Sequence, residues 1–129
     1  RGATTVEMAI VLPIFLLLIF AVFEFGRAIV MKQTLAEASR AGARTSVLAT
    51  TQNVSQVETA VRDYFEQVST SSFDTNKLRI TVSHSDLGTA ETGTNITTAV
   101  EVDFSEVTWI LPSFMAGGVL KGESSMTKE

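Results

Sequence analysis

The chain begins with a long apolar run that passes directly into a second helical pattern. Between Glu7 and Glu24, the sixteen residues Met8–Phe23 carry no charged side chain. As an α-helix they span about 24 Å, and with Val6 and Phe25-Gly26 the helix is long enough for a bilayer core of about 30 Å. The run therefore predicts a transmembrane helix. A removed signal peptide has a similar apolar region, but it ends at a small-residue cleavage site followed by an unrelated domain.

After the span, apolar and small residues recur at spacings of three and four, as on one stripe of a helix. The predicted stem helix runs from about Thr4 to about Ala49, roughly 70 Å. Its upper part is rich in small residues, and the pair Ala38/Gly42 has the spacing that lets helices approach closely. We expect the stripe to pack on the head of the same chain and also on neighbouring stems. The stripe consists of Ala28, Met31, Leu35, Ala38, Gly42, Thr45 and Leu48.

Beyond the stem, residues 1–49, the sequence predicts a small head domain, residues 50–129. Ser55 and Glu58 have the spacing of a capping box for a second helix that ends near Val68. Its apolar residues repeat at helical spacing, so we expect this helix to pack on the upper stem. The repeating residues are Val54, Val57, Val61, Phe65 and Val68.

Two alternating runs, Leu78–Val82 and Ile96–Phe104, predict strands that pair as antiparallel neighbours. The segment Val107–Leu111 continues a strand-like pattern, Pro112–Gly118 is expected to be a loop, and Val119–Met126 predicts an edge strand. The predicted fold class is α+β, with a long N-terminal helix, a short second helix and an antiparallel sheet of three to four strands. So thin a core is expected to close only against the stem.

Charged residues mark both ends of the apolar run, and a proline lies within it. Glu7 has no basic residue within one turn on its C-terminal side, so it needs an external partner or lies at headgroup level, where the helix dipole favours it. Glu24 and Arg27 are i, i+3 neighbours that can pair as an anchor at the membrane interface. Pro13 removes one backbone donor and predicts a local bend or unwinding.

Charge is distributed unevenly along the chain. The first 50 residues contain five basic and three acidic side chains, a net charge of +2, and the remainder contains five basic and eleven acidic ones, a net charge of −6. Such an acidic head does not favour a nucleic-acid partner, because phosphate backbones select clustered Lys and Arg. The absence of cysteine excludes disulfides and thiolate sites. A small head must then gain stability elsewhere, and association through the stem is the obvious candidate.

Few residues suggest catalytic or metal chemistry. His84 lies near Asp86, but one histidine with one carboxylate makes neither a metal site nor a catalytic triad. Glu101, Asp103 and Glu106 could serve as calcium ligands or acid–base groups, although the charged outer face of a half-buried strand predicts the same spacing. We expect neither enzymatic activity nor a cofactor.

Several segments of the stem together resemble a known family. The stretch Arg1–Glu7, followed by Ala9–Pro13 and Phe23–Arg27, is similar to the N-terminus of the TadE-like pilins of the tight-adherence (Tad) secretion and pilus system. The similarity extends through Ala36–Arg44, and the ending Met126–Glu129 resembles the family's short C-terminus. The resemblance implies a pilin-like fold and a structural role.

The resemblance also assigns roles to residues near the N-terminus. In that family, as in type IV pilins, a prepilin peptidase cuts after a glycine and leaves glutamate as the fifth residue of the mature chain. A cut between Gly2 and Ala3 would make Glu7 that residue. The resemblance then implies that the N-terminal amine of a neighbouring subunit pairs with Glu7 in the filament core.

Three functional hypotheses follow. In the first, the chain assembles through its N-terminal helix into a Tad or type IV-like pilus, a homo-oligomeric helical filament that exposes the head for surface attachment. In the second, it is a minor pseudopilin or bitopic component of the Tad apparatus that assists assembly. The third, a secreted enzyme or binding domain behind a signal anchor, does not explain the small residues above the membrane. For the first two, the expected partners are other pilin subunits, prepilin peptidase and the bacterial inner membrane before export to the cell surface.

Overall fold

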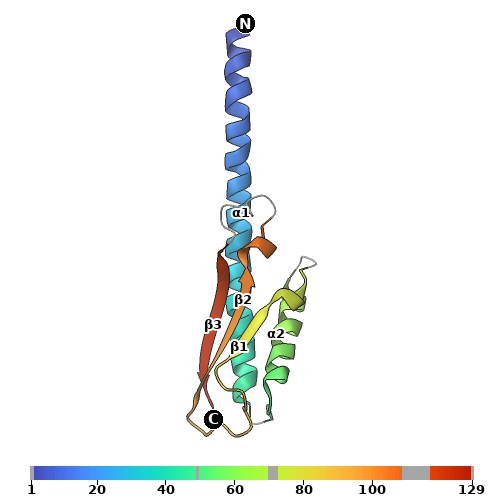
Figure 1. The fold of residues 1–129 in the computed structure, drawn as a ribbon, viewed down its shortest axis with the longest axis vertical. Coiled ribbons are helices and arrows are strands. Elements are labelled where there is room, and N and C mark those ends of the chain that lie inside the picture. Colours follow the sequence, from blue (N-terminus) through green and yellow to red (C-terminus); the bar gives the residue numbers. More distant parts are fainter. Residues whose placement is uncertain (1, 49, 70–72, 109–116, 129) are drawn as a thin grey trace.

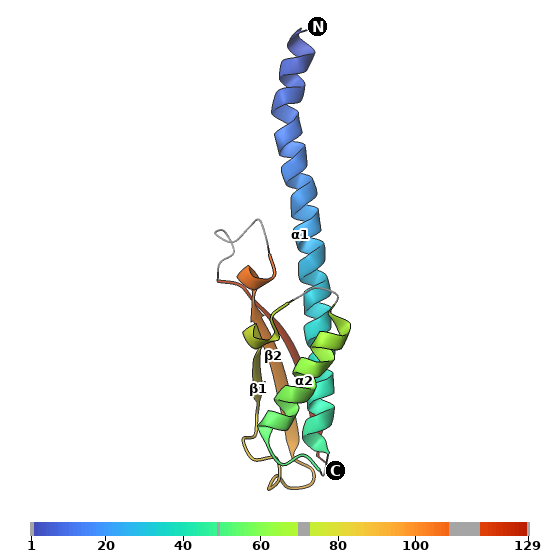
Figure 2. The same cartoon turned by 90° about the vertical axis from the view of Figure 1, so that its right-hand side faces the viewer.

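The computed structural model shows a long helix with a small α+β head packed along its distal half (Figures 1 and 2). It describes residues 2–48, 50–69, 73–108 and 117–128. Helix α1 (Gly2–Val47) is one continuous element of 46 residues, and α2 (Val54–Val68) returns beside its distal part. The predicted stem and the packing of the second helix on it are therefore confirmed.

The head sheet has three antiparallel strands in the order β1-β2-β3. In the register, Val100 of the central strand lies opposite Ile80 on one side and Gly122 on the other. The pairing of the two alternating runs and the C-terminal edge strand are confirmed. The strands are β1 (Arg79–Val82), β2 (Asn95–Asp103) and β3 (Val119–Thr127), and the short 3₁₀ helices are η1 (Thr75–Lys77) and η2 (Phe104–Glu106).

The hydrophobic core lies between this sheet and the two helices. Alternate residues of β2, among them Val100 and Val102, point inward and are fully buried, as expected for a strand with one covered face. Leu35 and Ala38 of α1 belong to the same core as Val61 of α2. The head therefore has a closed core only when the stem is included, as predicted.

Two glycines allow the elements of the head to approach the stem closely. A Cβ on Gly42 of α1 would lie 2.6 Å from Val61 of α2 and 2.9 Å from Thr98 of β2. A Cβ on Gly122 of β3 would overlap the backbone of Leu35 and lie 2.5 Å from the amide nitrogen of Ala36. Neither position has room for a side chain, so these glycines set how close α2 and β3 lie to α1.

The predicted capping box at the start of α2 is wrong. The residue before the helix is Asn53, which makes no side-chain capping hydrogen bond, and Ser55 already lies in the first helical turn. The hydrogen bond near the start of this helix is instead made by Gln56, whose Oε1 accepts from the backbone N–H of Gln52 at 2.9 Å.

The strand prediction also extended too far after β2. Phe104 begins η2 rather than ending a strand, and Val107 follows in a turn. The cause is the lack of a partner, because β3 begins opposite Asp103 and β1 begins opposite Glu101. Val107 is nevertheless buried in the core. The remainder of that predicted strand and most of the predicted loop lie in residues 109–116, outside the described residues.

Candidate assembly surface on the stem

The N-terminal half of α1 exposes an apolar surface on every side. Ile14 is 63% exposed and Phe23 is 68% exposed. The helix is long and apolar enough to cross a membrane, and its most apolar stretch of 18 residues has a mean hydropathy of 2.8 with no part buried inside the chain. Such a surface needs a bilayer or other protein chains to cover it.

Residues at the end of this surface that is farthest from the head are the predicted processing and pairing sites. Gly2 and Ala3 lie in the first turn of α1. Glu7 is exposed and makes no ion pair or side-chain hydrogen bond with any residue that the structure describes. Its carboxylate is therefore open to a group from another molecule. Cleavage after Gly2 stays a prediction.

Pro13 lies inside α1, and the helix continues through it without interruption. The helix therefore does not unwind at Pro13, and a local bend there stays a prediction. Proline removes only one backbone hydrogen bond, and the helix on both sides is long enough to keep its conformation across the loss.

Glu24 and Arg27 differ in their surroundings. Glu24 is only 6% exposed, whereas its neighbour Phe25 is 69% exposed, and Arg27 is an exposed side chain. Glu24 therefore points to the head side of α1, four residues before the buried Ala28. Both charged residues have interaction partners in the structure, and pairing with each other stays a prediction. The burial of Glu24 was missed, although its spacing from Ala28 continues the buried stripe.

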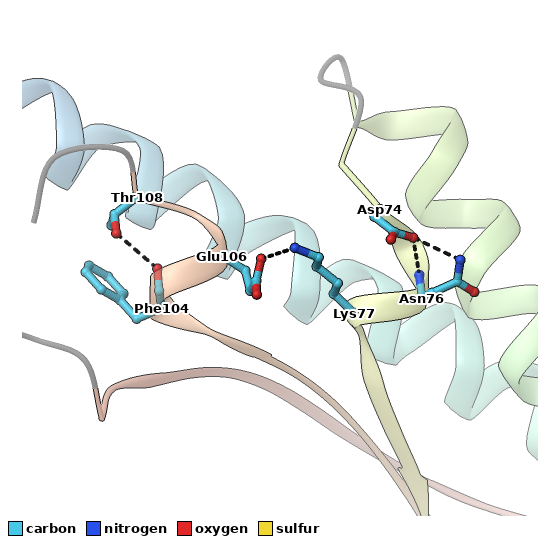
Figure 3. Close-up of polar contacts among 6 residues, drawn as sticks. All are labelled: Asp74, Asn76, Lys77, Phe104, Glu106 and Thr108. Carbon is cyan, nitrogen blue, oxygen red and sulfur yellow. Dashed lines mark hydrogen bonds and ion pairs between the residues drawn. The ribbon is translucent and has the colours of Figure 1, made fainter. Parts of the chain in front are cut away.

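Where the stem enters the head, a mostly apolar groove of about 590 Å³ lies between them. Phe23 and Val30 of α1 form one side, and Phe73 and Val107 of the head form the other. Glu106 also lines the groove and is bound by Lys77, as Figure 3 shows. The groove joins segments far apart in the sequence, so no local pattern predicted it.

The small residues of the upper stem are buried within the chain itself. Ala38 is fully buried, and Gly42 faces Val61 and Thr98 of the head. The close approach expected from their spacing is therefore made by α2 and the sheet of the same subunit. Contact of Ala38 and Gly42 with a neighbouring stem stays a prediction.

Two of the three acidic residues considered as metal ligands, Glu101 and Asp103, lie on the outer face of the sheet among basic residues, whereas Glu106 lies in η2 at the groove. Arg79 is 3.0 Å from Asp103 and 4.0 Å from Glu101. Lys121 is 3.8 Å from Glu101 and 2.8 Å from Glu123, whose hydrogen bond raises the pKa of Lys121 above its ordinary value. This is the charged outer face that alternation along β2 also predicted.

Histidine and carboxylate side chains do not gather elsewhere in the described part of the chain. No group of three or more such residues that could hold a metal ion is found there. His84 Nδ1 lies 3.2 Å from Ser83 Oγ, and Asp86 accepts a hydrogen bond from the backbone N–H of Gly88 at 3.1 Å. These contacts are local to their turn.

Comparison with known proteins places the similarity in the stem. The family model described as TadE-like protein matches residues 2–44, nearly all of α1 and none of the head. The resemblance expected from the stem residues is therefore confirmed. No curated protein and no solved structure matches the chain.

Proposed function

We propose, with the TadE-like stem as the premise, that this chain is a structural pilin-like subunit. It assembles through α1 into a Tad or type IV-like pilus and exposes its head for surface attachment. The observation that carries the proposal is the apolar N-terminal half of α1, which the head of the same chain leaves uncovered.

The size of this apolar surface limits where the subunit can exist. Burying one large apolar side chain is worth about 1.5–3 kcal/mol, and the exposed ones from Val6 to Phe25 number fourteen. Exposing them all to water would cost on the order of 20 kcal/mol even at the lower value. Outside a bilayer, the helix must therefore be covered by other helices. The proposal accordingly places the chain in the bacterial inner membrane before assembly and at the cell surface afterwards.

Within the filament, the exposed carboxylate of Glu7 supplies the pairing between subunits. A charge in an apolar environment is stable only with a partner. Prepilin peptidase, cutting after Gly2, would release an amine at Ala3, and that amine of a neighbouring subunit neutralises Glu7. The family resemblance supports this step, and so does the absence of any competing partner for Glu7 among the described residues.

Electron microscopy of the purified full-length chain tests the proposal. The parent is expected to form filaments and Glu7→Ala is not, while the control Glu91→Ala, which changes an exposed glutamate of the head, keeps them. Filaments from both the parent and Glu7→Ala would contradict the role of Glu7. N-terminal sequencing of the same material identifies the processing site.

A second candidate, a minor pseudopilin that assists assembly, rests on the same TadE-like stem. The behaviour of the unsubstituted parent protein distinguishes this minor role from that of the main filament subunit. If the purified parent forms no filaments but enters filaments of another pilin as a small fraction, the minor role is correct.

A further inference from the structure

The basic residues of the head differ in their contacts from two arginines of the upper stem. Each described basic residue of the head is engaged within the chain. In contrast, Arg40 and Arg44 of the upper stem are exposed and make no ion pair or side-chain hydrogen bond with the described residues. The engaged contacts are Lys77 with Glu106, Arg79 with Asp103, Lys121 with Glu123, Arg62 with the carbonyl of Thr75, and Lys128 with the carbonyl of Leu87.

The two arginines lie about one helical turn apart on the outer face of the stem. Their spacing of four residues places them one above the other on one side of α1. Leu35, Ala38 and Gly42, which pack against the head, lie on the opposite side. We call Arg40 and Arg44 the basic ridge.

The outer face of α2 carries the opposite charge. Val57, Val61 and Phe65 are buried against the core, while Asp63 and Glu66 are exposed on the other side of the helix. Asp63 has no ion pair or side-chain hydrogen bond in the described part of the chain, and Glu66 accepts only a bond of 3.2 Å from Thr75 Oγ1. We call Asp63 and Glu66 the acidic ridge.

The two ridges lie at similar heights along the stem. Val61 packs beside Gly42, and the hydroxyl of Tyr64 donates to Glu37 at 3.3 Å. Helices α1 and α2 run antiparallel (Figure 2), so Glu66 lies nearer the membrane than Asp63, as Arg40 lies nearer than Arg44. The axial spacings are also similar, about 6 Å for the arginines and about 4.5 Å for the acidic pair.

We propose that the basic ridge of one subunit docks on the acidic ridge of a second copy of this chain, pairing Arg44 with Asp63 and Arg40 with Glu66. The contact needs parallel stems and an axial offset of about one helical turn. It joins two different surfaces, so it repeats from copy to copy and builds an open helical assembly. The inference rests on the proposed pilus function and adds a contact between the upper stem and the head.

The contact is expected to fix orientation and register more than to supply affinity. Exposed ion pairs are individually weak and are screened by salt, whereas complementary charges align surfaces and exclude wrong pairings. Apolar packing of the N-terminal helices holds the subunits together, and the ridges select the rotation between neighbours.

A charge swap in the full-length chain tests the contact. The double variant Arg40→Glu/Arg44→Glu and the double variant Asp63→Lys/Glu66→Lys each place like charges opposite each other. Each is expected to lower filament yield at least tenfold at low salt, measured by sedimentation and electron microscopy. The variant with all four substitutions restores the opposite charges and is expected to recover most of the parent yield.

Two controls separate the contact from a general charge effect and from unfolding. Lys32→Glu changes an exposed basic residue of the stem outside the ridge and should leave the yield near that of the parent. Thermal unfolding must match the parent in every variant. Normal filaments from either double variant, or no recovery in the four-fold variant, would overturn the contact and leave the pilus function standing. A parent without filaments overturns both.

Discussion

The contact between β3 and the stem gives the sharpest stability prediction, through the substitution Gly122→Ala. The added methyl group would overlap the backbone of Leu35 and lie 2.5 Å from the amide nitrogen of Ala36, whereas ordinary contact begins at 3.4 Å. Because these are backbone atoms of a helix and the overlap with Leu35 is closer still, β3 must move away from α1 by more than the 0.9 Å between 2.5 Å and ordinary contact. A gap of that size forfeits a quarter to a half of the dispersion energy of the separated atoms.

Overpacking of a core costs about 1–3 kcal/mol, and the lost contact along β3 places Gly122→Ala near the upper value. For a head of this size, about 3 kcal/mol corresponds to a fall in melting temperature of roughly 12–24 °C. Calorimetry of the full-length chain in detergent measures this change in melting temperature. Gly117→Ala is the matched control, since its Cβ would meet no atom within 4 Å in the described part of the chain. Equal melting temperatures for the two variants would refute the close approach of β3 to α1.

Three further substitutions test the head. Thr98→Val removes a buried hydroxyl that has no hydrogen-bond partner among the described residues and should raise the free energy of unfolding by about 1 kcal/mol; a loss in urea titration would show that the hydroxyl is bonded. Phe65→Ala empties a core position that is 1% exposed and should cost about 3–5 kcal/mol while leaving the chain in the membrane fraction. Desolvation and the nearby Glu37 raise the pKa of Tyr64 above its ordinary value of 10.0, so its stabilising contribution is complete below pH 10 and is lost as the pH rises through the folded-state pKa. Tyr64→Phe should reduce the loss of stability above about pH 10, and equal slopes for variant and parent would contradict this assignment.

The elements of the fold could be predicted because their patterns are local. Val57, Val61 and Phe65 mark one face of α2 at helical spacing, and the alternation from Ile96 onward marks one face of β2. Strand ends were harder, because Phe104 continues the alternation but has no neighbouring strand to pair with. Periodicity shows which residues share a face, whereas pairing depends on where the partner strand begins.

The candidate site was predicted in part for a similar reason. The apolar run and the stem resemblance are continuous in sequence, so both were found. The groove between the stem and the head and the overlap at Gly122 depend on segments that meet only after folding. The burial of Glu24 was only partly predictable from the sequence. Its spacing from Ala28 indicated the buried stripe, but its charge favoured an exposed position at the membrane interface. A charged residue on a buried stripe is the signal that would have identified it.

The most direct test of the account is a helical reconstruction, by electron cryomicroscopy, of filaments grown from the purified full-length chain. Assembly through the stem predicts that the apolar residues of α1 from Val6 to Phe25 pack against one another at the filament axis, with the heads outside. The opposite finding is a filament held together by heads alone, with the N-terminal helices uncovered or still in detergent. That result would contradict assembly through the stem.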